Sequence, residues 1–357
     1  MRKRILAIFL AAVALACLLW GCKETTNGGT GASDETTPSS GEATVKLKEI
    51  TVGIAQDLDD SLDPYQMTAA GTREVMFNVF EGLVKPDSSG NYVNAVASDV
   101  SISEDGLTYV FTLRDNVVFH NGAACTPDDV LYSFETCAAT SVNSAVVEAL
   151  SAVASMTVEG DTLTMVLSAP NSDFLSYVAS VYIVPAGYTE QATQPVGTGP
   201  FKFVSRSVQE NVVLEKNADY YGTPAQVDKV TYQIYEDSTA LMMALKGGSV
   251  DICAHLTSAQ TAQLGSDFTI EEGTMNLVQA VYLNNAKAPF DNEKVRQAMS
   301  YAINRQEIMD IMADGHGTAV GSSIYPKLGK YFLPELVDYY SCDPAKGKAL
   351  LAEAGDP

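Results

Sequence analysis

The sequence predicts an α/β protein with more than one lobe, and three observations support this. About 310 residues follow a polar N-terminal stretch, which is more than one hydrophobic core usually organises. Some segments alternate apolar and polar residues with the period of a β-strand, and others repeat them with the period of a helix. This mixture is typical of α/β and α+β proteins.

The first 21 residues predict a secretory signal peptide. Positions 2–4 are basic, positions 5–20 are apolar, and Gly21 places a small residue before Cys22. The apolar run is shorter than the roughly 20 residues that cross a bilayer core. We therefore expect cleavage and an extracytoplasmic location rather than a membrane-spanning helix.

Residues 19–22, Leu-Trp-Gly-Cys, resemble a bacterial lipobox. The cysteine of that motif is acylated, so we expect a lipid anchor at Cys22 that holds the protein to the cell membrane. Trp20 departs from the small residue that is usual there, and an ordinary signal peptide with an incidental cysteine is the alternative. Residues 22–46 are rich in Thr, Ser, Gly and Asn, which predicts a disordered linker.

The net charge and the cysteines exclude several classes of site. A formal net charge of −22 disfavours a nucleic-acid partner. The cysteines after position 22 form no CxxC pair and no Cys/His cluster with the spacing of a metal site. Buried free thiols are the favoured interpretation, and a disulfide between Cys125 and Cys137 is the alternative. These later cysteines are Cys125, Cys137, Cys253 and Cys342.

Residues 107–122 predict a β-hairpin. Apolar and polar residues alternate from 107 to 113, in a composition that favours strands. A second short strand is expected at 117–120, directly before the tight-turn pair Asn121–Gly122.

A helix is expected directly afterwards, from Pro127 to about Ala139. Thr126 supplies an N-cap, Pro127 occupies the first helical position, and two aspartates follow in the first turn. Helical spacing then places four residues on one apolar face. They are Val130, Leu131, Phe134 and Cys137.

Three more helices are expected towards the C-terminus. The first is capped by Asp291 or Asn292, and the second runs from 306 to 313. The third begins after Asp343 as its cap and stops at Gly355. The residues expected to face inward are Val295, Met299, Ala302 and Ile303 in the first helix, and Leu350 and Leu351 in the third.

Nine stretches between residues 50 and 357 form a recognisable series of motifs. They are LDP (62–64), FEGL (80–83), EDGLTYVFTLRDNVVFHNG (104–122), TPDDVLYSFE (126–135), PVGTGPF (195–201), EKNADYYG (215–222), LKGGSVDI (245–252), APFDNEKVRQAMSYAINR (288–305) and DPAKGKALLAEAG (343–355). In this order they resemble the oligopeptide- and dipeptide-binding family of solute-binding proteins that serve ABC importers, a family that also includes nickel-binding lipoproteins. One departure is Gly347, where the family usually has a helix former; a glycine inside a helix costs about 1 kcal/mol relative to alanine.

The resemblance implies a periplasmic-binding-protein-like α/β fold of class II, or cluster C, in which two lobes joined by a hinge close on a ligand. Lobe I is expected at 47–273, with an inserted β-rich subdomain at about 90–194. Residues 274–357 are expected to begin lobe II. Because that lobe needs more residues than these in the family, we expect the second lobe to be truncated and the sequence to be a fragment.

Two ligand-facing stretches are expected from position in the family. Thr68, Ala69 and Ala70 match the extended backbone along which peptides pair as an added strand. The other stretch is 275–279, where the chain is expected to cross between the lobes and alternate side chains can face the cleft. Met275, Asn276 and Gln279 are the candidates there, and ordinary strand or hinge packing is the alternative for each residue.

The resemblance implies a monomeric receptor that delivers a solute to an ABC permease, without a cofactor, a metal or a nucleic-acid partner. An oligopeptide is the expected ligand. An oligosaccharide, a metal chelate or a signalling peptide is the alternative. The single tryptophan lies in the signal segment, which disfavours a sugar because sugars stack on aromatic faces.

A lipid-anchored hydrolase is the contrasting hypothesis, and the motifs argue against it. The sequence has no HExxH motif and no GxSxG motif, so no catalytic residue is assigned. His120 lies beside the expected hairpin turn, which favours a structural role, and residues 197–200 are expected to form a turn rather than a phosphate loop. Asp57, Asp59 and Asp63 lack the glycine of a calcium loop and predict a solvated acidic turn.

Overall fold

The computed structural model describes residues 48–273 and 278–355. The expected signal peptide, the linker and the anchor residue Cys22 lie outside the described residues, as do Met275 and Asn276. In the described part of the chain, no helix is both long enough and apolar enough to cross a membrane.

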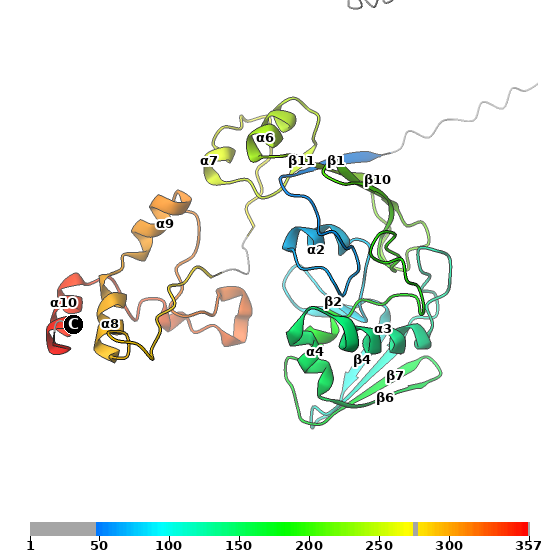
Figure 1. The fold of residues 1–357 in the computed structure, drawn as a ribbon, viewed down its shortest axis with the longest axis horizontal. Helices are drawn as coiled ribbons and strands as arrows, with labels where there is room; N and C mark the ends of the chain where they lie inside the picture. The colour runs from blue at the N-terminus through cyan, green and yellow to red at the C-terminus, as the bar shows by residue number, and fades with distance from the viewer. Residues whose placement is uncertain (1–47, 274–277, 356–357) are drawn as a thin grey trace, which may run out of the picture. The chain divides into compact units, whose positions relative to one another are not determined.

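A mixed five-stranded sheet organises one part of residues 48–273 (Figure 1). The strand order is β11-β1-β10-β9-β8, and β1 runs parallel to both β10 and β11, whereas β9 runs antiparallel to its two neighbours. The three parallel strands therefore end at the same edge of the sheet. The strands are β1 (Glu49–Ile54), β8 (Phe201–Ser207), β9 (Asn211–Lys216), β10 (Lys229–Ile234) and β11 (Ile252–Cys253).

A second sheet is four-stranded and antiparallel, in the order β4-β5-β7-β6. A short two-stranded sheet of β2 and β3 precedes it in the chain. In β5 and β7 burial alternates residue by residue, as the period of 2 requires when one face packs against a core. The strands are β2 (Val84–Pro86), β3 (Tyr92–Asn94), β4 (Ala97–Ile102), β5 (Thr108–Leu113), β6 (Val153–Glu159) and β7 (Thr162–Leu167).

The predicted hairpin at 107–122 is wrong in its pairing. β5 forms as expected, but its partners are β4 and β7. Residues 117–120 form no strand and have a single antiparallel bridge, from Val118 to Ala124 across the predicted turn. The His120 amide instead donates to the Gly197 carbonyl at 3.0 Å. A partner so far away along the chain leaves no local signal.

The predicted helix after Thr126 is confirmed as α3 (Pro127–Thr140), with a capping box between Thr126 and Asp129. Its inward face differs from the prediction, because Leu131 is only half-buried whereas Asp129 and Ser133 are buried. The Ser133 hydroxyl accepts from the Val184 amide at 2.9 Å, which allows a polar side chain to be buried there.

The other helices of residues 48–273 are short. Helix α4 contacts α3, and both contact the four-stranded sheet, on which Figure 1 shows them. The hydrophobic core includes five fully buried phenylalanines: Phe80, Phe111, Phe119, Phe134 and Phe174. The helices are α2 (Ala70–Met76), α4 (Ser144–Ser151), α5 (Phe174–Val178), α6 (Ser238–Lys246) and α7 (Ser258–Thr261).

The three helices predicted near the C-terminus are confirmed as α8 (Glu293–Ala302), α9 (Arg305–Ala313) and α10 (Pro344–Glu353). Short 3₁₀ helices at Pro326–Tyr331 and Pro334–Leu336 lie between α9 and α10. The predicted stripe of α8 is partly wrong, because its buried residues are Val295 and Ala298, and Ala298 packs against Gly347 of α10. Of the remaining predicted residues, Met299, Ile303, Leu350 and Leu351 are half-buried and Ala302 is exposed.

The four cysteines of the described residues are free thiols, so the alternative disulfide between Cys125 and Cys137 is wrong. Burial raises the pKa of Cys125 to about 12 and that of Cys137 to about 11. Both thiols are therefore protonated and unreactive at neutral pH.

Candidate ligand-binding site

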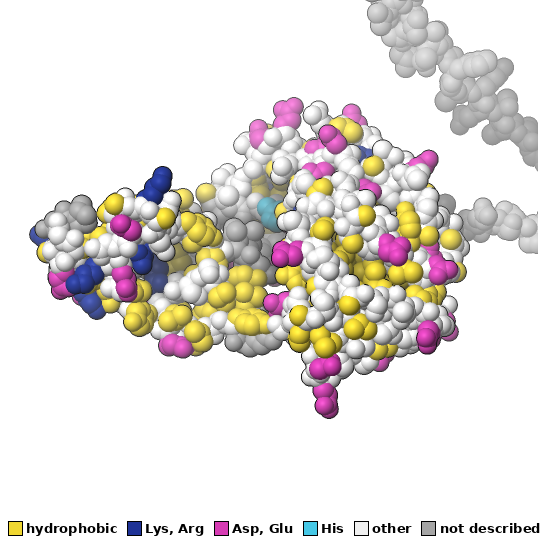
Figure 2. Space-filling model, turned by 60° about the horizontal axis from the view of Figure 1, so that its bottom comes forward, with side chains coloured by type: hydrophobic (Ala, Val, Ile, Leu, Met, Phe, Trp, Pro, Cys, Tyr) yellow, Lys and Arg dark blue, Asp and Glu magenta, His cyan; other side chains and the backbone are white. Residues whose placement is uncertain are grey.

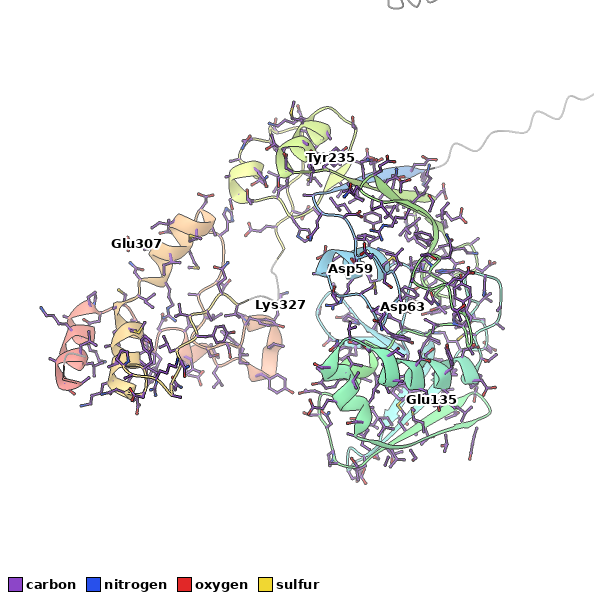
Figure 3. The ribbon with its side chains drawn as sticks, in the orientation of Figure 1. Asp59, Asp63, Glu135, Tyr235, Glu307 and Lys327 are labelled. Atoms are coloured by element: carbon purple, nitrogen blue, oxygen red, sulfur yellow. The ribbon has the colours of Figure 1, made fainter. Side chains whose placement is uncertain are left out.

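The shared edge where β11, β1 and β10 end is the natural place to look for a ligand site. In open sheets with parallel strands, ligands commonly bind beyond the carboxyl ends of the strands. The segments that leave this edge are 55–69 after β1, 235–237 after β10 and 254–257 after β11. Figure 3 labels Asp59 and Tyr235, which belong to the first two of these segments.

Asp59 holds the segment that contains the predicted residues Thr68 and Ala69. Its Oδ2 atom accepts from the Thr68 and Ala69 amides at 2.8 and 2.9 Å, and its Oδ1 atom accepts from the Thr68 hydroxyl at 3.1 Å. Partial burial raises the pKa of Asp59, but the hydrogen bonds from Ala69 and Thr68 outweigh it and hold the pKa below its ordinary value. The carboxylate thus fixes the turn that precedes α2.

Arg206, on β8, fixes the chain on the other side of Asp59. Its guanidinium donates to the Asp59 and Leu58 carbonyls at 2.6 and 2.9 Å and forms an ion pair with Asp57 at 3.0 Å. The Gln209 amide donates to the second oxygen of Asp57 at 2.8 Å. The Arg206 side chain is only 10% exposed, so the charged bonds are shielded from water.

The prediction of a solvated acidic turn at Asp57, Asp59 and Asp63 is therefore wrong. Each carboxylate accepts a hydrogen bond from at least one backbone amide. The Asp63 carboxylate accepts from the Tyr65 amide at 2.8 Å. Among the described residues no group of three or more acidic, histidine or cysteine side chains is placed to hold a metal ion.

The three residues predicted to form an extended ligand-binding backbone differ from one another. Thr68 is exposed and Ala69 has extended φ and ψ angles of −73° and 139°. Ala70 is already the first residue of α2, so the extended assignment is wrong there. The amides of Thr68 and Ala69 both donate to Asp59. An added strand could not use these two donors while Asp59 keeps its place.

Of the three candidate residues in the second predicted stretch, 275–279, the structure describes only Gln279. Gln279 is exposed and lies in a segment without regular secondary structure. Met275 and Asn276 lie outside the described residues.

No sequence pattern indicated a contact between Glu74 and His255. The Nε2 atom of His255 lies 2.7 Å from the Glu74 carboxylate, which joins α2 to the segment after β11. His255 has a positive φ of 59°, in the left-handed region that few non-glycine residues adopt. Both side chains are exposed, so this pair lies on the accessible surface of the sheet edge.

A pocket opens beside the start of α2. It has a volume of about 150 Å³ and is bounded by the turn at 64–67, by Arg73, by residues 141–146 and by residues 180–182. The Val142 amide donates to the Tyr65 carbonyl at 2.9 Å, which ties two of these walls together. The pocket is thus built from segments that are distant in the sequence.

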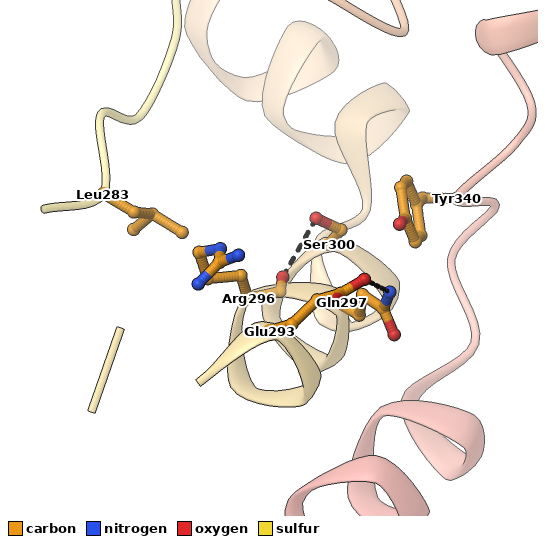
Figure 4. A pocket seen from close by; sticks show the side chains of 6 residues that line it. All are labelled: Leu283, Glu293, Arg296, Gln297, Ser300 and Tyr340. Carbon is orange, nitrogen blue, oxygen red and sulfur yellow. Dashed lines mark hydrogen bonds between the residues drawn. The ribbon is translucent and has the colours of Figure 1, made fainter. Parts of the chain in front are cut away.

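Another pocket lies within residues 278–355 and is shown in Figure 4. It has a volume of about 240 Å³ and is lined chiefly by α8, together with Leu283 and Tyr340. Glu293 and Arg296 both line it, so opposite charges share this pocket. Glu293 also accepts from the Gln297 side chain at 2.8 Å.

His120 has the structural role that the sequence predicted. Its Nε2 atom donates to the Gly199 carbonyl at 3.0 Å, and its Nδ1 atom accepts from the Gly197 amide at 3.3 Å. Burial lowers the pKa of His120 to about 4, which keeps the ring neutral. The turn at 197–200 contacts Val79, and a Cβ on Gly197 would lie 2.2 Å from the Val79 carbonyl oxygen. Close packing, and not phosphate binding, explains this glycine.

Glu81 is a buried carboxylate that joins two of the family-like stretches. It accepts from the Lys85 ammonium, from the Tyr220 hydroxyl at 2.8 Å and from the Tyr221 hydroxyl. Both tyrosines belong to the EKNADYYG stretch and Glu81 belongs to FEGL. Because its partners neutralise and bond the charge, Glu81 is a structural group.

Comparison with known proteins identifies a family. The model described as "Bacterial extracellular solute-binding proteins, family 5 Middle" matches residues 91–357. A glutathione-binding protein, GsiB of Pectobacterium atrosepticum, is 30% identical over 316 residues, covering 83% of this chain and 59% of that protein. Heme-binding protein A of Haemophilus influenzae is 30% identical over 298 residues, covering 74% and 54%.

A solved structure agrees with the sequence comparison. The periplasmic binding protein DppA of Helicobacter pylori, solved with the peptide STSA, superposes with a TM-score of 0.67 at 26% identity. The match covers 87% of this chain and 67% of DppA. The fold is therefore the mixed α/β fold of cluster C binding proteins over part of their length. The chain spans somewhat more than half the length of the two curated relatives.

Proposed function

Since this chain belongs to family 5 of the bacterial extracellular solute-binding proteins, a family of binding proteins rather than enzymes, we propose that it is a receptor that binds a small solute outside the cytoplasm and delivers it to an ABC permease. The observation that carries this proposal is the family match across residues 91–357 together with the fold. The receptor acts as a monomer and needs no cofactor.

The proposed ligand is an oligopeptide. A relative of known structure was solved with a peptide, and the edge of the parallel strands offers a hydrogen-bonded surface beside an open pocket. Thr68, Ala69, Ala70, Met275, Asn276 and Gln279 are the proposed ligand-facing residues. Because Asp59 occupies the Thr68 and Ala69 amides, these two residues contact the ligand through side chains and carbonyl groups.

The proposed mechanism is closure about a hinge. Lobe I is proposed to comprise residues 47–273, with an inserted subdomain at about 90–194, and lobe II to begin at 274. Ligand binding between the lobes favours a closed shape that the permease distinguishes from the open one. The turn fixed by Arg206 and Asp59 supplies a preorganised surface, so little ordering cost is paid on binding.

The proposed location is the outer surface of the cell membrane, through a lipid on Cys22. A signal peptide at 1–21 and a linker at 22–46 complete this proposal. The argument for it is the order of basic, apolar and small residues before the cysteine.

Native mass spectrometry of the protein purified from its own membranes tests the function. We expect small peptides to remain bound and to be released on denaturation without cleavage. A retained solute that is not a peptide, such as heme, would support the receptor function and contradict the peptide as its ligand. Catalytic turnover of an added peptide or ester by the purified protein would contradict the proposal.

A further inference from the structure

We propose that the pocket beside the start of α2 binds a carboxylate of the ligand, and that Arg73 is the residue that binds it. This inference rests on the proposed receptor function and assigns a subsite within it. For a peptide, the group in question is the free C-terminal carboxylate.

Arg73 is a basic side chain in a strongly acidic part of the chain. This part of the chain has nine basic residues against 30 acidic ones, and on the face seen in Figure 2 acidic side chains are scattered over it with few basic ones between them. Most basic side chains here would be expected to pair with a carboxylate. Four of the nine do so in the described structure: Lys85, Lys202, Arg206 and Lys229. Arg73 is one of the five that form no ion pair there, and among these five it is the one that lines the pocket beside α2.

Arg73 has no such partner. In the part of the chain that the structure describes, no carboxylate oxygen lies within 4.0 Å of its guanidinium, and one nitrogen, Nη2, donates to the Met67 carbonyl at 3.1 Å. An arginine has five N–H donors in a fixed fork that matches a carboxylate. The bond to Met67 fixes the side chain and leaves donors for a ligand.

The rest of the pocket suits a small polar group. Ser141, Asn143 and Ser180 line it with polar side chains, and Tyr182 adds a phenol. Burial raises the pKa of Tyr182 while the positive charge of Arg73 opposes that rise, so the two side chains share one electrostatic environment. The phenol stays protonated and can donate a second hydrogen bond to an anion.

The pocket is continuous with the proposed ligand-facing residues. Met67 precedes Thr68 directly, and Arg73 lies about one helical turn after Ala70 in α2. Side chains on a helix lean towards its N-terminus, which directs Arg73 towards the turn at 68–69. A ligand whose carboxylate is bound by Arg73 would therefore continue past Thr68 and Ala69.

The pocket on α8 does not offer the same chemistry. Arg296 lines it, but Glu293 lines it too, one helical turn away. Arg296 also donates to the Phe290 carbonyl at 2.7 Å. An incoming carboxylate would meet a like charge there, which favours the Arg73 pocket as the anion site.

Two peptide pools test the proposal. One contains dipeptides to pentapeptides with free C-termini, and the other contains the same sequences as C-terminal amides. Each pool is added to purified protein, captured peptides are read by native mass spectrometry, and the dissociation constant of the best-captured sequence is measured in both forms. The variants are Arg73→Gln and Arg73→Lys, with Lys246→Gln as control because Lys246 is exposed on α6 and lines no part of the pocket.

We expect the free acid to bind about ten- to hundred-fold more tightly than the amide, the range that a hydrogen-bonded charge supplies. Arg73→Gln should weaken the binding of the free-acid peptide by that factor and leave the binding of the amide peptide unchanged. Arg73→Lys should recover part of the loss, which excludes a folding defect, and Lys246→Gln should change neither form.

Two other outcomes distinguish a failure of the proposed carboxylate subsite from a failure of the proposed peptide-binding function. In one, both pools bind, but the acid and amide peptides bind with equal affinity or Arg73→Gln weakens both alike. Either result would contradict the carboxylate subsite and leave the receptor function supported. If the unaltered protein captures neither pool, the peptide ligand itself is contradicted.

Discussion

A Cβ on Gly347 would lie 2.9 Å from the carbonyl oxygen of Ala298. Gly347 is the buried residue of α10, and Ala298 is one of two buried residues of α8. At this point the backbone oxygen of Ala298 in α8 occupies the space that a side chain on residue 347 of α10 would need. The glycine that departs from the family pattern is therefore required by close helix packing, which outweighs its poor helix propensity.

Gly347→Ala should destabilise the protein by about 1–3 kcal/mol, because a backbone oxygen cannot move away as a flexible side chain can. Helix propensity alone predicts the opposite, a gain of about 1 kcal/mol. Urea unfolding followed by circular dichroism measures the sign. Gly71→Ala is the matched control, since a Cβ at Gly71 in α2 meets nothing within 4 Å. Stabilisation by both substitutions would contradict the close contact.

Asp59→Asn should loosen the turn at 68–69 and lower the free energy of unfolding by about 1 kcal/mol at pH 7, a small value because the site is only half-buried. The folded-state pKa of Asp59 is depressed. Its contribution is therefore complete above the unfolded pKa of about 3.9 and is lost as the pH falls through the lower folded value. The difference from the unaltered protein should shrink in that acid range.

Asp60→Asn is the control for this experiment, because Asp60 is the exposed neighbour. An equal effect of both substitutions would mean that net charge, and not the hydrogen bonds to Thr68 and Ala69, stabilises the turn.

His120 should make the protein less stable as the pH falls from 6.5 to 4. The folded pKa is about 4, whereas the unfolded value is about 6.5, so the unfolded state binds the proton first and is favoured. The whole effect is roughly 3 kcal/mol. Urea unfolding at a series of pH values should show this slope, and His120→Gln should remove it. The exposed His255, changed to Gln, should leave the slope intact.

Cys22→Ala should release the protein from membranes into the periplasm or the medium, because the proposed acylation site would be lost. Immunoblots of membrane and soluble fractions measure the distribution. Cys342→Ala, which removes an exposed thiol elsewhere, should leave the protein with the membrane. Retention of the Cys22→Ala variant would mean that another contact anchors the chain.

Local signals in the sequence predicted much of the fold. The caps at Thr126 and Asp343 predicted α3 and α10 because a capping residue bonds to amides two or three positions away. The strand pattern of β5 was equally local. Its partners were not, since β7 lies some fifty residues further along the chain, and the nearer candidate at 117–120 was chosen wrongly.

The candidate site was predicted less well for the same reason. The family resemblance directed attention to Thr68 and Ala69, but the sequence did not show that Asp59 occupies their amides or that Arg206 fixes Asp59 from β8. Nor did it show that Arg73 lines a pocket together with residues 141–143.

The sequence by itself determined the family, the mixture of helices and strands, the positions of the capped helices and the absence of a recognisable catalytic motif. Each of these depends on residues that interact within a few positions or on motifs in a fixed order. Tertiary structure alone decided which acidic residues are bonded, why Gly347 is a glycine and which arginine without an ion pair lines the pocket beside α2. Those properties depend on groups brought together from distant positions, and burial then fixes their charge and their hydrogen bonds.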